Sequence, residues 1–486
     1  MKKGGIERMK LLYAASEAAP FCKTGGLADV AGALPKALAA SGVEVSVVLP
    51  LYDAVPDWAR REMTFVRMLQ VSLAWRNQTC GVFSLVRDGV TYYFLDNGYY
   101  YRRRELYGHY DDGERFAFFS KAIVDMIPAL GLSFDVIHAN DWQTALIPVY
   151  LKCLYRDDPR YQGMKTVFTI HNIAYQGSFP RGFLSDVAGI DDAYFRSGLL
   201  AYNDGINLLK SAIVLCDALT TVSPTYAREI LTAYYGAGLD GILRANAGKL
   251  CGILNGIDTD VYNPARDEAL SVPYSAGSPE GKQENKLALQ RTLGLHADLD
   301  VPVIALVTRL AEHKGIDLIA AVLDDIMSEN IQLVVLGRGE WKYEQLFQQA
   351  KRRYPGKISV NILFSEDFAH KIYAGADMLL MPSKSEPCGL AQMVALRYGT
   401  LPIVRETGGL ADTVHAYNPA TGEGNGFSFT NYNAHDMLYT IRLAASLYHD
   451  REVWNTLVRR GMSEDFSWKR SAKAFEELYE RIAEKK

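Results

Sequence analysis

Short apolar runs alternate with amphipathic stretches along the chain, a pattern that predicts strands followed by helices. An apolar run at residues 9–15 leads into a stretch in which Leu27, Val30 and Leu34 lie on one helical face. A second apolar run at 43–49 completes a βαβ unit, so we expect a parallel sheet. The alternation continues with predicted strands at 134–138, 166–170 and 218–222 and helices at 114–130, 142–155 and 206–215.

Three further runs depart from this order. Residues 65–73, 81–86 and 90–95 favour strands, and the last two are joined by the turn Asp88-Gly89. We therefore expect an antiparallel insertion in the first half.

The second half begins the alternation again after a loose stretch at 250–280, which predicts a domain boundary. Strands are predicted at 303–307, 331–336, 358–364, 378–381 and 401–404, and helices at 315–328, 341–353, 366–374 and 390–398. The tail from Asp436 predicts helices only, the last of them beginning at Ser467-Trp468. Since 486 residues exceed one hydrophobic core, we expect two doubly wound α/β domains at 1–253 and 254–464, with a helix at 465–486 packing back on the first.

Polar loops follow the ends of several predicted strands. The stretch Lys23-Thr24-Gly25-Gly26 precedes the first helix, and Thr407-Gly408-Gly409 has nearly the same sequence around it in the second half. Helix N-termini with glycines can hold an anion, and Lys23 adds positive charge. Because ligands bind beyond the carboxyl ends of parallel strands, we expect these loops to meet in one cleft and face one anionic ligand.

Composition limits the partners. The net charge of -4 and pI near 6.2 do not indicate binding to nucleic acid or to an anionic membrane. The six cysteines are scattered without metal-ligand spacing, which favours a reducing compartment and predicts no metal site. The first ten residues lack the pattern of a targeting segment, so we expect a cytoplasmic protein. The sequence does not indicate an oligomeric state.

Two charged loops can support group transfer to or from a phosphate. Arg309 and Lys314 flank a predicted strand-to-helix loop and suit a diphosphate, although a solvated pair is the commoner explanation. Glu386 precedes a glycine turn, where it could steady a cationic transition state or simply complete a loop. His171 and Asp141 end neighbouring strands, a position that also fits purely structural roles.

Taken together, these motifs resemble those of the bacterial glycogen synthases and plant starch synthases, in order over nearly the whole chain. The resemblance is carried by Lys-Thr-Gly-Gly-Leu-Ala-Asp-Val, His-Ala-Asn-Asp-Trp, Thr-Ile-His-Asn-Ile-Ala-Tyr-Gln-Gly, Leu-Asn-Gly-Ile-Asp, Glu-Pro-Cys-Gly-Leu and Arg-Glu-Thr-Gly-Gly-Leu-Ala-Asp. It implies the GT-B fold, with two Rossmann-like domains and a cleft between them. It also implies transfer of glucose from ADP-glucose to the non-reducing end of an α-1,4-glucan such as glycogen, with retention and without a metal or other cofactor.

The resemblance also implies roles for individual residues. The catalytic set would be Glu386, His171, Asp141, Arg309 and Lys314. The nucleotide-sugar-binding set would be Lys23, Gly25, Gly26, Asn255, Phe364, Cys388, Gly389, Leu390, Thr407, Gly408 and Gly409. The acceptor-binding set would be Tyr175 and Gln176. Some retaining relatives carry a second Glu eight positions after the first, but this chain has Val394 there.

Two alternatives stay open at this point. A glucan phosphorylase would share the architecture, but it would bind pyridoxal phosphate through a lysine and absorb light accordingly. A non-catalytic glycogen-binding protein would bind the polymer and release no ADP.

Overall fold

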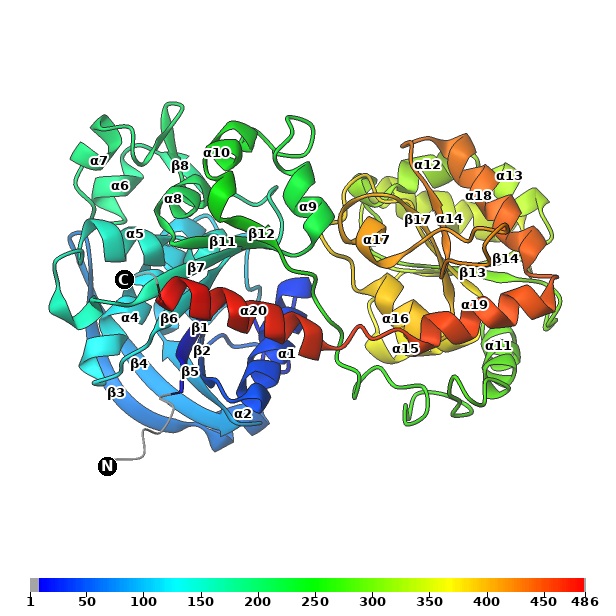
Figure 1. Cartoon of the computed structure of the whole chain (residues 1–486), viewed down its shortest axis with the longest axis horizontal. Helices are drawn as coiled ribbons and strands as arrows, with labels where there is room; N and C mark the ends of the chain where they lie inside the picture. Colours follow the sequence, from blue (N-terminus) through cyan, green and yellow to red (C-terminus); the bar gives the residue numbers. More distant parts are fainter. Residues whose placement is uncertain (1–7, 485–486) are drawn as a thin grey trace. The chain divides into compact units, whose positions relative to one another are not determined.

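The computed structural model describes residues 8–484, which divide into two compact units (Figure 1). Unit 1 contains the described residues up to Gly256 together with the last helix, α20 (Trp468–Ala483). Unit 2 is Ile257–Ser467. Residues 1–7 and 485–486 lie outside the described residues. They include the start of the first predicted domain and the end of the predicted last helix.

The main sheet of unit 1 has nine strands in the order β12-β11-β7-β6-β1-β2-β5-β4-β3. These strands are β1 (Lys10–Ala14), β2 (Glu44–Pro50), β3 (Thr64–Leu73), β4 (Arg76–Arg87), β5 (Val90–Asp96), β6 (Val136–Asn140), β7 (Lys165–Ile170), β11 (Ala218–Thr221) and β12 (Leu250–Gly252). A small second sheet contains β8 (Ser178–Pro180), β9 (Ala201–Tyr202) and β10 (Gly205–Asn207). The predicted parallel sheet is confirmed.

The predicted antiparallel insertion extends this sheet. β3 pairs with β4 and β4 with β5 in antiparallel fashion, as expected. However, β5 also pairs with β2 in parallel, which makes the three strands one edge of the main sheet. Tyr92 and Phe94 of β5 are fully buried in the core, which explains why this strand belongs to the central layer.

The helices of unit 1 include one long pair, α1 (Gly26–Ser41) and α4 (Asp112–Ala129). The others are α2 (Asp57–Glu62), α3 (Gly98–Tyr101), α5 (Leu146–Cys153), α6 (Phe183–Asp186), α7 (Ala193–Arg196), α8 (Leu208–Leu215), α9 (Pro224–Glu229) and α10 (Asp240–Ala245). The helix predicted at 142–155 starts as a separate 3-10 turn, Trp142–Thr144, before α5.

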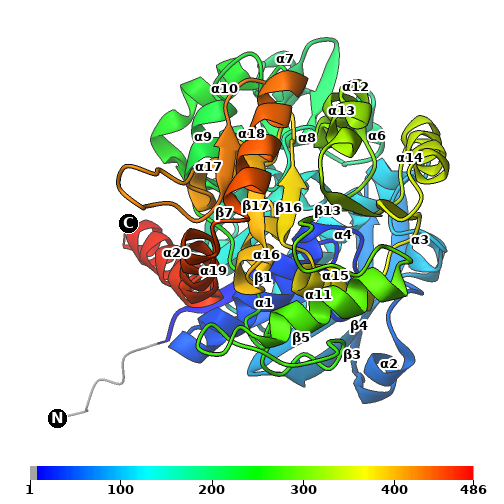
Figure 2. The ribbon, with the colours of Figure 1, turned by 90° about the vertical axis from the view of Figure 1, so that its right-hand side faces the viewer.

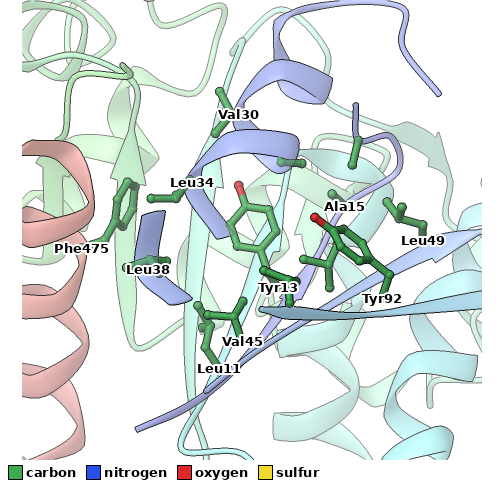
Figure 3. Packing of buried hydrophobic residues seen from close by; sticks show 14 of the residues in the cluster. Leu11, Tyr13, Ala15, Val30, Leu34, Leu38, Val45, Leu49, Tyr92 and Phe475 are labelled. Carbon is green, nitrogen blue, oxygen red and sulfur yellow. The ribbon is translucent and has the colours of Figure 1, made fainter. Parts of the chain in front are cut away.

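The core of unit 1 joins the first and last elements of the chain. Figure 3 shows Leu34 and Leu38 of α1 beside Phe475 of α20, with Tyr13 of β1 nearby. These apolar faces are the ones that the helical periodicity of the sequence predicts.

Unit 2 has a six-stranded parallel sheet in the order β15-β14-β13-β16-β17-β18. Its strands are β13 (Val303–Val307), β14 (Gln332–Leu336), β15 (Ile358–Asn361), β16 (Met378–Met381), β17 (Leu401–Arg405) and β18 (Phe427–Phe429). Its helices are α11 (Gly281–Thr292), α12 (Ile316–Ala321), α13 (Leu323–Ser328), α14 (Trp341–Arg353), α15 (Glu366–Gly375), α16 (Ala391–Arg397), α17 (Gly408–Thr413), α18 (Ala434–Leu447) and α19 (Arg451–Ser463).

Helices cover both faces of this sheet. α12, α13 and α18 lie on one side, and α11, α15, α16 and α19 lie on the other (Figure 2). The doubly wound α/β prediction is therefore confirmed. The helix predicted at 315–328 is two helices, because the backbone leaves helical geometry at Val322 (φ -129°, ψ 22°). No helix within residues 8–484 combines the length and the apolar character needed to cross a membrane.

Candidate functional site

The candidate catalytic residues of unit 2 follow three adjacent strands. Arg309 and Lys314 come after β13, Glu386 after β16 and Thr407 after β17. The order β13-β16-β17 brings the carboxyl ends of these parallel strands side by side at one edge. The sheet topology thus collects positions that are almost a hundred residues apart in the chain.

An ion pair joins two of these loops. Lys314 Nζ lies 2.6 Å from Glu386 Oε2, and Ser383 Oγ donates to the same oxygen at 3.0 Å. The Glu386 side chain is only 8% exposed and that of Lys314 22% exposed. A buried carboxylate requires such partners, and Lys314 and Ser383 supply them to Glu386.

A second cation and a histidine adjoin this pair. Burial lowers the pKa of His313, and the charges of Lys314 and Arg309 lower it further, while Glu386 opposes them. His313 is therefore neutral at pH 7. Arg309 is exposed, which leaves its planar guanidinium accessible to an anion at the edge of the sheet.

Glycines let the loops after β16 and β17 interlock. A Cβ atom at Gly408 would overlap the carbonyl oxygen of Glu386, and one at Gly409 would overlap that of Cys388. Gly409 N donates to the Glu386 carbonyl oxygen at 3.2 Å. The structure thus gives these two glycines a role in loop packing, beside the ligand-binding role that the sequence resemblance implies.

The remaining predicted positions differ in exposure. Phe364 is 79% exposed beyond β15, while Asn255 and Cys388 are buried. Gly389 has φ +70°, a left-handed conformation that favours glycine. α16 begins at Ala391, so the Gly389 and Leu390 amides precede the helix that the sequence predicts to start at 390.

The candidate residues of unit 1 also follow adjacent strands, β1, β6 and β7. Asp141 follows β6 and has φ 54°, an uncommon conformation outside glycine. Its Oδ1 atom accepts a hydrogen bond from His171 N at 2.8 Å, and the backbone of Asn172 donates to the same carboxylate. This arrangement ties the end of β6 to the end of β7.

The His171 ring lies in a polar network. Its Nε2 atom donates to Asn140 Oδ1 at 2.8 Å, and Tyr13 donates to the same oxygen at 3.0 Å. Burial lowers the pKa of His171 to about 3 and raises that of Asp141 to about 7. At neutral pH the imidazole is uncharged and can exchange a hydrogen bond with a sugar hydroxyl.

The loop before α1 contains a residue that the sequence analysis missed. Glu17 is 3% exposed, and its Oε2 atom accepts from Thr24 N at 2.5 Å and Thr24 Oγ1 at 2.8 Å. Lys23 Nζ lies 2.8 Å from Asp29 Oδ1. The amide of Thr24, which lies in the loop that we expected to face an anionic ligand, is therefore already bound by a carboxylate of this chain. The only sequence feature that could have indicated this contact is an acidic residue between the first strand and the glycine loop.

The two predicted acceptor residues behave differently. Tyr175 is 52% exposed. Gln176 Nε2 donates to the carbonyl oxygens of Ile173 and Ala237, and its Oε1 accepts from Asn207 at 2.6 Å. The Gln176 side chain thus holds its own loop, which leaves Tyr175 as the more accessible of the two.

The described part of the chain contains no group of three or more His, Cys, Asp or Glu side chains that could hold a metal ion. The charged groups described at the carboxyl edges of the two sheets are lysine, arginine, aspartate and glutamate side chains.

Two α/β units with parallel sheets, each with charged loops at the carboxyl ends of its central strands, define a GT-B glycosyltransferase. The sequence matches the starch synthase catalytic domain over residues 10–245 and the glycosyl transferases group 1 over residues 295–460. The chain belongs to the glycogen and starch synthase family, and it is a hexosyltransferase.

Individual relatives agree with this assignment. A glycogen synthase of Geobacillus thermodenitrificans (strain NG80-2) is 55% identical over 478 residues, 98% of both chains. One of Bacillus cereus (strain B4264) is 51% identical over 98% of this chain and 100% of the relative. The solved catalytic domain of starch synthase IV from Arabidopsis thaliana, bound to ADP and acarbose, is 34% identical with a TM-score of 0.91, covering 98% of this chain and 100% of that one.

Proposed function

We propose that this chain transfers glucose from ADP-glucose to the non-reducing end of an α-1,4-glucan such as glycogen, with retention of configuration and release of ADP. The observation that carries the proposal is the Lys314–Glu386 pair with Arg309 beside it. Support also comes from the similar relatives, which are glycogen synthases, and from the ADP and acarbose bound to the starch synthase.

The charges at the site suit this reaction. Cleavage of the bond between sugar and phosphate develops positive charge on glucose and negative charge on the departing diphosphate. Arg309, Lys314 and Lys23 would neutralise the diphosphate, and Glu386 would stabilise the glucosyl cation. Because Lys314 is paired with Glu386, its ammonium can hold this carboxylate beside the glucosyl cation and also bind the diphosphate. We propose that no metal is required, because these cations supply the positive charge that a metal would supply elsewhere.

Retention is proposed to proceed by front-side displacement, with the acceptor hydroxyl entering beside the leaving phosphate. The Asp141 carboxylate is bonded to the His171 and Asn172 amides, an arrangement that favours a positioning role over a nucleophilic one. Trapping a covalent glucosyl group on Asp141 or Glu386 would overturn this hypothesis.

We also propose that the reaction takes place in the cytoplasm. All six cysteines lie within residues 8–484 and none of them forms a disulfide bond there, as expected in a reducing compartment.

The test is an assay of nucleotide release from ADP-glucose and from UDP-glucose, each with and without glycogen. We expect ADP release that depends on glycogen, is faster than UDP release and persists in EDTA. A chain that binds glycogen but releases no nucleotide would refute the enzymatic assignment, and preference for UDP-glucose would refute the donor.

A further inference from the structure

A buried carboxylate lies beneath the glycine loop of unit 1. Glu17 comes after β1, at the carboxyl edge of the sheet, and is 3% exposed. Burying a carboxylate is unfavourable unless hydrogen bonds compensate for the lost water. The donors that compensate here belong to a single loop.

That loop is held at two consecutive residues. Glu17 Oε2 accepts from Thr24 N at 2.5 Å and from Thr24 Oγ1 at 2.8 Å, and the backbone of Gly25 donates to the same carboxylate. Gly25 is the N-cap of α1, with no side-chain cap of its own. Glu17 therefore satisfies the amides of Thr24 and of the N-cap Gly25, which lie just before the first residue of α1.

The position of Lys23 depends on this anchor. Its peptide bond leads directly into Thr24, and its ammonium reaches Asp29 in the first turn of α1 at 2.8 Å. Glu17 fixes the backbone on one side of Lys23, and Asp29 holds the end of its side chain. The lysine is thus oriented before any ligand arrives, which lowers the entropic cost of binding an anion.

We propose that Glu17 is a positioning residue that, as a carboxylate, fixes the Lys23–Gly26 loop so that Lys23 is presented to the nucleotide sugar. This inference rests on the proposed function, which assigns the nucleotide sugar to Lys23. It adds a residue that touches neither substrate.

The proposal makes the loop sensitive to pH. Burial raises the pKa of Glu17 to about 7, hydrogen bonds from Thr24 and Gly25 lower it in part, and the charge of Asp29 raises it. Protonation converts one acceptor oxygen into a donor and weakens the hold on the loop. The titratable groups whose charges interact with Glu17 are Asp29, Cys22, Tyr52, Tyr107 and Asp141, and Lys23 pairs with Asp29.

The test compares Glu17→Gln with wild type and with Glu62→Gln, a matched change at an exposed carboxylate of α2. Deuterium exchange of the peptide containing Thr24 and Gly25 measures the loop directly, without turnover. We expect faster exchange in Glu17→Gln alone. We also expect its KM for ADP-glucose at pH 8 to rise about tenfold, as for the loss of one hydrogen bond to a charged group, with kcat within about twofold.

The pH dependence of KM distinguishes a loss of loop positioning from a general loss of stability. In wild type and Glu62→Gln, KM for ADP-glucose should fall as the pH rises from 6 to 8 and Glu17 ionises. In Glu17→Gln the KM should stay higher and vary less over this range. Thr24→Val, which removes one donor and keeps Glu17, should raise KM by about threefold and preserve the slope, and it carries the test if Glu17→Gln does not fold.

Unchanged exchange in Glu17→Gln would overturn the positioning role. Faster exchange with an unchanged KM would overturn the link to the nucleotide sugar. If the wild-type chain releases no ADP from ADP-glucose, the proposed function fails and that link fails with it, while deuterium exchange still decides whether Glu17 holds the loop.

Discussion

At the scale of single residues, the site of unit 2 places a carboxylate and an ammonium where neither is fully hydrated. Glu386 and Lys314 depend on each other, since the Glu386 side chain is only 8% exposed and the pair is 2.6 Å apart. Removing one member of a buried pair leaves the other uncompensated. Arg309 differs, because it is exposed and its charge is hydrated.

Arg309→Ala and Lys314→Ala should each lower kcat by at least about 10²-fold, because each removes a charge that stabilises the departing diphosphate. Only Lys314→Ala should also lower the melting temperature. The measurements are ADP release and thermal unfolding. Lys342→Ala, a change at an exposed lysine of α14, is the control. Near-normal turnover in either variant would remove that residue from its assigned role.

Lys23→Ala should weaken the handling of ADP-glucose and leave glycogen affinity nearly unchanged, because the ammonium is assigned to the nucleotide sugar alone. KM for ADP-glucose and binding of glycogen measure the two effects separately. Equal losses of both would contradict that division.

At the scale of elements, adjacent strand ends build each site, and interlocking loops keep its parts in register. The alternation of apolar and polar stretches predicts the strands that precede these loops, so the positions of Arg309, Glu386 and His171 at strand ends could be read from the sequence. The contact between the Glu386 carbonyl and Gly408 could not, because it joins separate loops whose approach depends on the packed sheet. The hold of Glu17 on Thr24 was missed for a related reason, since a single acidic residue after a strand has no distinctive spacing.

Gly408→Ala should destabilise unit 2 by about 2–4 kcal/mol and abolish activity, because its Cβ would displace the Glu386 loop. Gly277→Ala, where the nearest atom lies 3.9 Å from the added Cβ, should be nearly neutral. Denaturant unfolding and ADP release measure the difference. Equal behaviour of the two variants would show that the loops do not interlock in solution.

At the scale of the whole molecule, the last helix of the chain completes the hydrophobic core of unit 1, which also contains the first strand. Trp468, Phe475 and Tyr479 of α20 are buried against residues of β1 and α1. Tyr479 also bonds to His138 Nδ1 at 2.7 Å on β6. The short strands β8, β9, β10, β12 and β18 were not predicted, because two or three residues form too short an apolar run to be recognised.

Phe475→Ala should destabilise unit 1 by about 3–5 kcal/mol, because it opens a cavity in this core. Tyr479→Phe, which removes only the hydroxyl, should cost about 1 kcal/mol. Thermal unfolding measures both. A melting profile of Phe475→Ala that matches the wild type would contradict the packing of α20.

His138 should make stability depend on pH. Burial, with a smaller contribution from His171, lowers its pKa from 6.5 to about 3. Between these values the unfolded chain binds a proton that the folded chain does not, so stability falls as the pH falls from 6.5. In His138→Gln the fall in melting temperature between pH 6.5 and 4.5 should be shallower. Equal slopes would contradict the buried neutral histidine.

The return of α20 to unit 1 has a consequence for synthesis. A ribosome makes the chain from its N-terminus, so the strands of unit 1 emerge long before Trp468–Ala483 does. Until then the apolar surface that α20 covers has no partner, and the second unit is made in the interval. The first unit to be translated is therefore the last to complete its core, and a nascent chain halted before Trp468 would leave that surface open to chaperones and to aggregation.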